Sequence, residues 1–267
     1  MTPERDILAE IFARKALDLD AARRAVPLAE MAARARAAAP ALDFLQALRA
    51  AAPTGRPALI AEIKAASPSR GQIARDFDPL GLARTYQANG ARAISILTEE
   101  HYFKGSLQIL RDAAGLTPRL PLLRKDFLSD PYQIYEARAA GADAVLLIAA
   151  SLQPAQLAEL HALARDIGMA ALVEVHSAPE LETALQSCDP PLVGINNRDL
   201  RDFTVRLETT LALRPLIPAG KLVVAESGIH TRADVDRLAA AGVGAILVGE
   251  ALVAAADTAE QVRSLAG

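Results

Sequence analysis

Residues 122–150 read LLRKDFLSDPYQIYEARAAGADAVLLIAA, and they contain one complete unit of the fold. One apolar run ends at Lys125, and a second covers Ala144 to Ile148. Between them, Asp130-Pro131 predicts a helix start, because aspartate accepts from free N–H groups of a first turn and proline fits there. Gly141 predicts the helix end, since glycine readily adopts the left-handed conformation that stops a helix. The stretch therefore predicts a strand, a helix and another strand.

The same alternation extends in both directions from this stretch and gives eight predicted strands. Most of them are nearly continuous apolar runs, which is typical of strands buried on both faces. Strict alternation of strand and helix indicates parallel strands joined by right-handed crossovers. We therefore predict a (β/α)8 TIM barrel over residues 57–267. Its strands are Ala58 to Ala65, Ala91 to Leu97, Leu120 to Lys125, Ala144 to Ile148, Ala170 to Val175, Leu192 to Asn196, Leu222 to Ala225 and Ala245 to Val248.

The main structural alternative is an open, doubly wound sheet. That fold predicts a glycine-rich dinucleotide fingerprint after the first strand, where the chain reads AEIKAASPSRG instead. Residues 1–56 are predicted to be an N-terminal helical extension that covers the N-terminal end of the barrel or reaches towards its mouth. With no linker or low-complexity stretch in between, residues 1–267 are expected to form a single TIM-barrel domain.

Composition excludes several classes of protein. The chain has 267 residues and a formal net charge of -3, which provides no broad cationic surface for nucleic acid or an anionic membrane. Charges interrupt the N-terminal apolar residues too often for a secretory signal or a membrane span. Cys188 is the only cysteine, so no internal disulfide can form. We expect a cytoplasmic protein with no obligate protein partner.

Charged side chains occur at the predicted carboxyl ends of strands, where barrel enzymes place their chemistry. Alternation directs Glu62 and Lys64 to the same face of the first strand, as a structural ion pair or as ligand-binding groups. In the third strand, one of Arg124 and Lys125 must point inward. An inward Lys125 is expected near Lys64, which would lower its pKa and let it donate a proton near neutral pH.

Two further strands end in polar groups that can contact a ligand. Glu174 is predicted to point inward in LVEVHS, either to neutralise a lysine or to take part in catalysis. His176 follows with the same parity, but no motif requires it. In GINNRDL, Asn196 can hydrogen-bond a hydroxyl or a carboxylate and Arg198 can bind an anion. A simple turn is the alternative reading of that segment.

The last two predicted strands end in AESGI and LVGEAL, which together indicate a phosphate site. Glycine lets backbone N–H groups approach an anion closely at the start of a short helix. The loops after strands seven and eight are also the recurrent phosphate-binding corner of barrel enzymes. The predicted participants are Ser227, Gly228, Gly249, Glu250 and, from the neighbouring loop, Ser67.

The remaining histidines and the cysteine do not suggest a metal or a nucleophile. His101, His161 and His230 share no metal-like spacing with carboxylates, and we predict no metal. Cys188 has no base near it in the sequence, so a reactive thiol is not expected.

Seven segments together resemble the indole-3-glycerol phosphate synthase family across nearly the whole chain. They are IAEIKAASPSRG, ILTEEHYFKGS, LLRKDFLSDPYQIYEARAAGADAVLLIAA, LVEVHS, GINNRDL, AESGI and LVGEAL. The resemblance implies that 1-(2-carboxyphenylamino)-1-deoxyribulose 5-phosphate is closed to an indole with loss of carbon dioxide and water, in tryptophan biosynthesis. It implies a phosphorylated small-molecule substrate and no redox cofactor.

The resemblance also implies roles for individual residues. Lys125 matches the catalytic lysine that protonates the ribulose carbonyl, and Glu174 would steady the positive charge on the anilino nitrogen. Lys64 would pair with anionic groups and share in the dehydration. The other implied contacts are Glu62, Asn196 and Ser227 for hydroxyls and carboxylate, Arg198 beside the carboxyphenyl ring, Phe103 and Phe127 as a sandwich around it, and Ser67, Gly228, Gly249 and Glu250 at the phosphate.

Two other functions remain open at this point. Another phosphate-binding barrel, such as a sugar-phosphate isomerase or a phosphoribosylanthranilate isomerase, shares the predicted phosphate corner. It does not need Lys64, Lys125 and Glu174 together. A catalytically silent barrel that binds a phosphorylated regulator is the second alternative, and the intact set of acids and bases argues against it.

Overall fold

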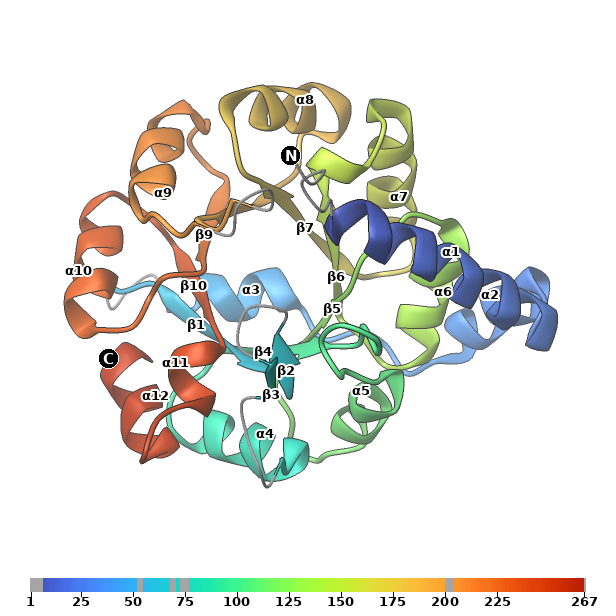
Figure 1. Cartoon of the computed structure of the whole chain (residues 1–267), viewed down its shortest axis with the longest axis horizontal. Helices are drawn as coiled ribbons and strands as arrows, with labels where there is room; N and C mark the ends of the chain where they lie inside the picture. The colour runs from blue at the N-terminus through green and yellow to red at the C-terminus, as the bar shows by residue number, and fades with distance from the viewer. Residues whose placement is uncertain (1–6, 52–54, 68–70, 73–76, 200–203, 267) are drawn as a thin grey trace, which may run out of the picture.

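The strands form a closed barrel in the computed structural model, which describes residues 7–51, 55–67, 71–72, 77–199 and 204–266. Eight parallel strands are hydrogen-bonded in the order β1-β10-β9-β8-β7-β6-β5-β4, and β4 returns to pair with β1. Figure 1 shows most of the helices as a ring around these strands. The predicted (β/α)8 barrel is confirmed, and the open sheet is excluded.

The barrel strands lie where the apolar runs predict them, with differences of one or two residues at some ends. They are β1 (Ala58–Ile63), β4 (Ala93–Leu97), β5 (Leu122–Lys125), β6 (Ala144–Ile148), β7 (Ala170–Val175), β8 (Leu192–Asn196), β9 (Leu222–Glu226) and β10 (Ala245–Val248). A short antiparallel pair, β2 (Ala66–Ser67) and β3 (Gly71–Gln72), follows β1.

The helices include three that precede the barrel and a set that alternates with its strands. Their bounds are α1 (Ile7–Ala25), α2 (Leu28–Ala37), α3 (Phe44–Arg49), α4 (Pro79–Ala88), α5 (Leu107–Ala114), α6 (Pro131–Ala139), α7 (Pro154–Asp166), α8 (Ala178–Cys188), α9 (Glu208–Leu213), α10 (Arg232–Ala240), α11 (Glu250–Val253) and α12 (Thr258–Ala266), with short 3-10 turns at Ala149–Ser151 and Arg214–Leu216. Among the described residues, no helix combines the length and apolar character that a bilayer span requires.

The predicted helix boundaries have the expected chemistry. Asp78 accepts from Gly81 N at 2.9 Å and Asp130 accepts from Tyr132 N at 2.8 Å, each ahead of a proline in the first turn. Gly141 follows α6 with a φ of 89°, a conformation that favours glycine. These local signals set the length of each unit of the barrel.

Alternation along the strands divides the apolar core into two layers. Within each strand, alternate side chains such as Leu59 of β1 and Ile246 of β10 pack against the surrounding helices, and the side chains between them fill the barrel. The interior layer contains Ala58, Ile60, Ala93, Leu123, Ala144, Leu146, Ile148, Leu172, Leu192, Leu222, Val224, Ala245 and Leu247. The next inward position on several strands is polar or charged, so the packed core ends where the site begins.

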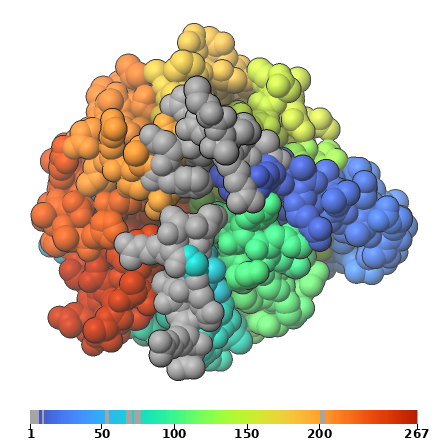
Figure 2. All heavy atoms as spheres, in the orientation of Figure 1, coloured from blue at the N-terminus to red at the C-terminus, as the bar shows by residue number. Residues whose placement is uncertain are grey.

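The N-terminal extension both covers the N-terminal end of the barrel and reaches its mouth, the two arrangements that the sequence left open. Phe44 and Leu48 of α3 are buried against the interior layer and close the N-terminal end of the barrel. Helix α1 instead reaches the mouth, where Lys15 pairs with Asp126 and Arg23 pairs with Asp130. Helices α1 and α2 project beside α6 beyond the rounded barrel (Figures 1 and 2).

A buried aspartate connects the extension to the barrel below β5. Asp143 is fully buried and accepts hydrogen bonds from Leu42 N at 2.7 Å and Leu122 N at 2.8 Å. Arg119 also pairs with both carboxylate oxygens of Asp143. One side chain thus fixes the segment before α3 against the strand that carries Lys125.

We expect Asp143→Ala to destabilise the protein by about 3 kcal/mol, because it leaves the partly buried guanidinium of Arg119 and two backbone N–H groups without their acceptor. In a chain of this size, that loss lowers the melting temperature by roughly 6–12 °C. Thermal unfolding followed by circular dichroism measures it. Asp236→Ala removes an exposed i,i+4 pair with Arg232 and serves as the control, with a change under about 0.5 kcal/mol. Equal melting temperatures for the two variants would contradict the account.

Candidate active site

The predicted site residues gather around one cavity at the carboxyl ends of the strands. Its volume is about 410 Å³. Twelve of the thirteen predicted residues line it: Glu62, Lys64, Phe103, Lys125, Phe127, Glu174, Asn196, Arg198, Ser227, Gly228, Gly249 and Glu250. The exception is Ser67, which lies in β2 but whose side chain is outside the described part of the structure. The expected convergence at the barrel mouth is therefore present for these twelve.

Glu62 and Lys64 form an ion pair on one wall of the cavity. Lys64 Nζ lies 2.9 Å from Glu62 Oε1, as their shared parity predicts. Ser95, buried on the neighbouring β4, donates to Glu62 Oε2 at 3.5 Å. Gly249 faces the same carboxylate, since a Cβ built there would lie 2.5 Å from Glu62 Oε1. A larger residue at this position would have to displace the Glu62 side chain, whether or not an anion is bound.

Lys125 is the inward residue of its pair and lies between two buried carboxyl groups. Its Nζ is 3.3 Å from Glu174 Oε2 and 3.4 Å from Glu226 Oε2. Arg124 points to the helix layer and pairs with Glu136 of α6 at 2.9 Å. Alternation along β5 therefore separates a structural arginine from the lysine that faces the cavity.

These contacts overturn one expectation about Lys125. Burial alone would lower the pKa of Lys125, but the carboxylates of Glu174, Glu226 and Glu62 outweigh it and hold the pKa above its usual value. The predicted lowering of this pKa is wrong, because three carboxylates act on the ammonium and two of them lie within 3.4 Å of it. Lys125 is therefore charged at neutral pH, which is the form that a general acid must have before it donates.

Glu226 is a site residue that the sequence analysis missed. It is the last residue of β9, is 2% exposed and lines the cavity. Burial and the nearby carboxylates of Glu174 and Glu62 raise the pKa of Glu226, whereas Lys125 opposes that shift. Its Oε1 has no hydrogen-bond partner among the described residues. The signal was available, because Leu222, Val224 and Glu226 share the inward parity of β9.

Small residues after β9 and β10 form the corner where a phosphoryl group is expected. Ser227 and Gly228 both have positive φ, 65° and 74°, so the chain turns sharply as it leaves β9. A Cβ at Gly228 would also lie 2.6 Å from a methyl group of Val205. On the other side, Arg198 lies 3.8 Å from Glu250. The corner thus has a tight backbone turn and a cation at its edge.

Two phenylalanines form the apolar part of the wall, but they do not leave a slot between them. The rings of Phe103 and Phe127 contact each other, with centroids 6.0 Å apart and planes tilted by 38°. An aryl ring stacked between them would need a wider separation. In this structure a bound aryl group would therefore lie against the pair, and the expected sandwich is not formed.

An ammonium between carboxyl groups, beside an anion corner and an apolar wall, can perform acid-base chemistry on an aromatic phosphorylated substrate. A profile of the family described as indole-3-glycerol phosphate synthase matches residues 8–265. The chain belongs to the indole-3-glycerol phosphate synthase family. The resemblance stated from the seven segments is thereby confirmed.

Relatives named indole-3-glycerol phosphate synthase match over nearly their whole length. The protein of Albidiferax ferrireducens is 52% identical over 94% of this chain and 95% of its own. That of Acidithiobacillus ferrooxidans is 51% identical over 97% and 98%, and that of Roseiflexus castenholzii is 52% identical over 98% of both chains.

More distant solved structures share only the fold with this indole-3-glycerol phosphate synthase family member. The 3-hexulose-6-phosphate synthase of Salmonella typhimurium has a TM-score of 0.64 at 12% identity, covering 78% of this chain and 96% of its own. A mutant tryptophan synthase alpha-subunit of Pyrococcus furiosus has a TM-score of 0.59 at 18% identity, covering 79% and 97%.

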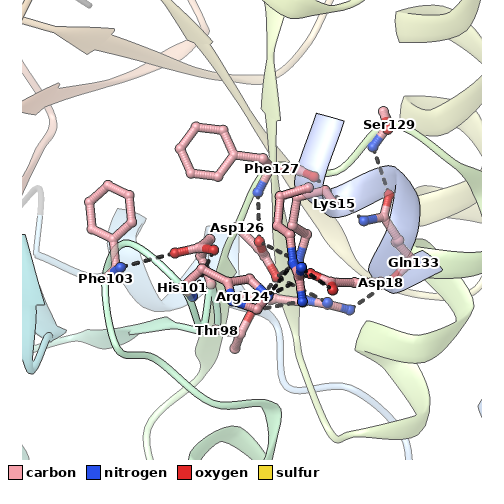
Figure 3. A network of polar contacts seen from close by, with 12 residues as sticks. Lys15, Asp18, Thr98, His101, Phe103, Arg124, Asp126, Phe127, Ser129 and Gln133 are labelled. Atoms are coloured by element: carbon pink, nitrogen blue, oxygen red, sulfur yellow. Dashed lines mark hydrogen bonds and ion pairs between the residues drawn. The ribbon is translucent and has the colours of Figure 1, made fainter. Parts of the chain in front are cut away.

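A buried network of polar contacts around Asp126 holds its two neighbours in the sequence, Lys125 and Phe127, in place. Asp126 accepts from Thr98 Oγ1 at 2.6 Å and pairs with Arg124 at 3.1 Å and with Lys15 of α1 at 2.9 Å. Figure 3 shows this carboxylate among those partners, with the Phe127 ring directed away from them. Because Asp126 separates Lys125 from Phe127 in the sequence, the network positions both of these cavity residues.

We expect the contribution of Asp126 to stability to disappear in acid. Burial raises the pKa of Asp126, but Lys15, Arg124 and the Thr98 hydroxyl outweigh it and lower the pKa to about 2. A lowered native pKa stabilises the fold above the unfolded value near 3.8, and the effect is lost as pH falls through about 2. Urea unfolding should therefore show Asp126→Asn less stable than wild type by about 2 kcal/mol at pH 7, and by roughly half of that at pH 3. A difference that is independent of pH would contradict this assignment.

Proposed function

We propose that this chain closes 1-(2-carboxyphenylamino)-1-deoxyribulose 5-phosphate to indole-3-glycerol phosphate, with loss of carbon dioxide and water, in tryptophan biosynthesis. The observation that supports this most strongly is the position of Lys125 between Glu174 and Glu226 in the barrel mouth. Family membership over residues 8–265 supports the same reaction. The chemistry consists of proton transfers and changes of C–C and C–O bonds, which these side chains can assist.

Ring closure begins when the aromatic carbon that carries the carboxylate attacks the ribulose carbonyl. We assign Lys125 the role of donating a proton to the carbonyl oxygen as the new C–C bond forms. An ammonium in a partly desolvated site offers both the proton and a positive charge to the developing alkoxide. Loss of carbon dioxide then restores the aromatic ring, and the electron pair of the broken C–C bond stays on the ring.

Carboxylates stabilise the cation that forms on the anilino nitrogen. We assign this role to Glu174, whose pKa stays low because Lys125 and His176 outweigh the effect of burial. The Glu62–Lys64 pair, 2.9 Å apart, is placed to assist the later loss of water. Asn196 and Ser227 are assigned to hydroxyl and carboxylate contacts from the ends of β8 and β9.

The two ends of the substrate have separate places in the cavity. We assign the phosphate to the backbone of Gly228 and Gly249, with Ser67 and Glu250 beside it. The carboxyphenyl ring is assigned to the wall formed by Phe103 and Phe127, with Arg198 near its carboxylate. This arrangement extends the substrate across the mouth, so that its carbonyl lies over Lys125.

The proposed setting is the cytoplasm, where phosphorylated metabolites are available and a single cysteine stays reduced. The proposal includes a small-molecule substrate and no protein partner. It also treats residues 1–267 as one folding unit, since Phe44 and Leu48 of the extension are part of the barrel core.

An assay of the purified protein with the carboxyphenylamino substrate tests the function. The expected result is an indole absorbance and fluorescence signal, with one carbon dioxide released for each indole formed. Conversion of phosphoribosylanthranilate or of sugar phosphates without indole formation would point to an isomerase instead. Binding of a phosphorylated ligand without turnover would point to a regulatory barrel, and either of these results overturns the proposal.

A further inference from the structure

His176 is a largely buried titratable residue that has no proton-transfer or binding role in the steps above. It follows β7 directly, and its side chain is 11% exposed. Its Nε2 lies 3.4 Å from Glu174 Oε1, a separation that suits an ion pair rather than an aligned hydrogen bond, and no other acceptor contacts Nε2 among the described residues. Its Nδ1 lies 3.1 Å from Glu180 Oε2. The imidazole thus lies between two carboxylates.

Glu180 is itself fixed by the start of α8. It accepts from the backbone N of His176 at 2.7 Å and from Ser177 Oγ at 2.8 Å. Ser177 is the residue that caps this helix, and its Oγ accepts from Glu180 N at 3.4 Å. A carboxylate at a helix start is further stabilised by the helix dipole. The imidazole therefore has a rigid anionic anchor on the side opposite to Glu174.

The position of the ring decides which kind of role it can have. His176 does not line the cavity that holds Lys125 and Glu174. It lines a second cavity of about 430 Å³, whose wall also includes Ser177, Glu180 and Asn196. A substrate in the mouth would contact Glu174 and not the imidazole behind it. Any effect of His176 on the reaction must therefore pass through Glu174.

We infer that His176 is a positioning residue, an imidazolium held by Glu180 that orients the carboxylate of Glu174 and keeps it ionised opposite Lys125. The inference rests on the proposed function, because it concerns the carboxylate assigned to the anilino cation. It divides the two oxygens of Glu174 between two cations, with His176 next to Oε1 and Lys125 next to Oε2. The carboxylate is then held in place before the substrate arrives.

The charges around the pair support this reading. Burial would lower the pKa of His176, but Glu174 and Glu180 outweigh it and raise the pKa to about 10. Glu174 is also faced by Lys125 from β5, Asn196 from β8 and Glu226 from β9. The other charged residues of the second cavity are Asp199 and Arg206. A neutral imidazole would leave Lys125 and the contact with Asn196 to oppose the effect of burial on the pKa of Glu174.

The test compares pH profiles of kcat and of kcat/KM for wild type, His176→Gln and Glu180→Gln. Glutamine retains an N–H donor without the positive charge. We expect His176→Gln to lower kcat about 10-fold with KM within about twofold, since the lost contact supports Glu174 rather than substrate binding. The acidic limb that reports ionisation of Glu174 should move to higher pH, because Glu174 loses a cation that lowers its pKa. Glu180→Gln should shift the limb in the same direction by less.

A control and a second measurement separate this role from folding and from the proposed function. Thr183→Ala, which removes a hydroxyl contact to Pro179 O within α8, should leave the acidic limb in place. Imidazole ¹⁵N chemical shifts should show wild-type His176 protonated at pH 8. An unmoved acidic limb in both variants of an active enzyme, or neutral His176 at pH 7, overturns the inference alone. A folded wild type that forms no indole overturns the proposed function, and the ¹⁵N shifts still decide whether His176 is charged.

Discussion

Lys125→Ala is expected to lower kcat by about 10³-fold while the barrel stays folded, because general-acid catalysis by one group typically contributes 10²- to 10⁴-fold. The ammonium lies within 3.4 Å of both Glu174 and Glu226, so its loss also leaves two buried carboxyl groups without their cation. The measurement is the initial rate of indole formation, with circular dichroism to establish that the variant is folded.

Lys125→Arg is the matched variant that separates proton donation from charge. The guanidinium retains the positive charge for Glu174 and Glu226, but it cannot give up a proton near neutral pH. We expect it to be nearly as inactive as Lys125→Ala while recovering the stability that the alanine variant loses. Turnover close to wild type in either folded variant would remove Lys125 from the role of acid.

Glu174→Gln is expected to lower kcat by about 10²- to 10³-fold, with a smaller change in KM. The amide keeps the shape of the side chain but not the negative charge that faces the developing anilino cation, and such electrostatic terms are worth about 3–4 kcal/mol in the transition state. Glu174 is 1% exposed, so solvent has little access to the cation that the lost carboxylate would have stabilised. Steady-state kinetics at several pH values provide the measurement.

Glu182→Gln makes the same chemical change at an exposed position of the following helix and controls for net charge. It should leave kcat and KM unchanged. If Glu174→Gln retained kcat within about threefold of wild type, the charge of Glu174 would contribute less than one kcal/mol, and its assignment would fail.

Most of the fold could be predicted from local signals, because those signals are also the forces that build each unit. Aspartate caps before Pro79 and Pro131 fix where helices start, and Gly141 fixes where one ends. Runs such as Leu192 to Asn196 then form strands that are buried on both faces, with helices on one side and the barrel interior on the other. Some strand ends differ from the prediction by a residue or two, as in β4, which starts at Ala93 and not at Ala91.

The candidate site could be predicted where the alternation of side chains along a strand decides which residues face the cavity. Lys125 faces the cavity and Arg124 faces α6 because neighbouring residues of a strand point to opposite sides. The same rule, applied to Val224, would have found Glu226. The prediction for the pKa of Lys125 was wrong because parity gives the direction of a side chain but not its distance from others, and the carboxylates that raise this pKa come from β1, β7 and β9.

Contacts between distant segments carry no local signal and could not be predicted. Lys15 and Asp126 are far apart in the chain, and either one alone is an ordinary charged residue. The contact between His176 and Glu174 could be guessed from their spacing, but the anchoring of His176 by Glu180 depends on where α8 starts. Such pairs form only after the barrel has closed.

The most direct test of the central claim is a crystal structure of the protein with indole-3-glycerol phosphate bound. The account predicts the phosphate on the backbone of Gly228 and Gly249 and the indole against Phe103 and Phe127. It places the Lys125 ammonium beside the indole carbon that carries the glycerol chain, within hydrogen-bond reach of a glycerol hydroxyl. Product bound outside this mouth, or with Lys125 and Glu174 remote from the indole, would contradict it.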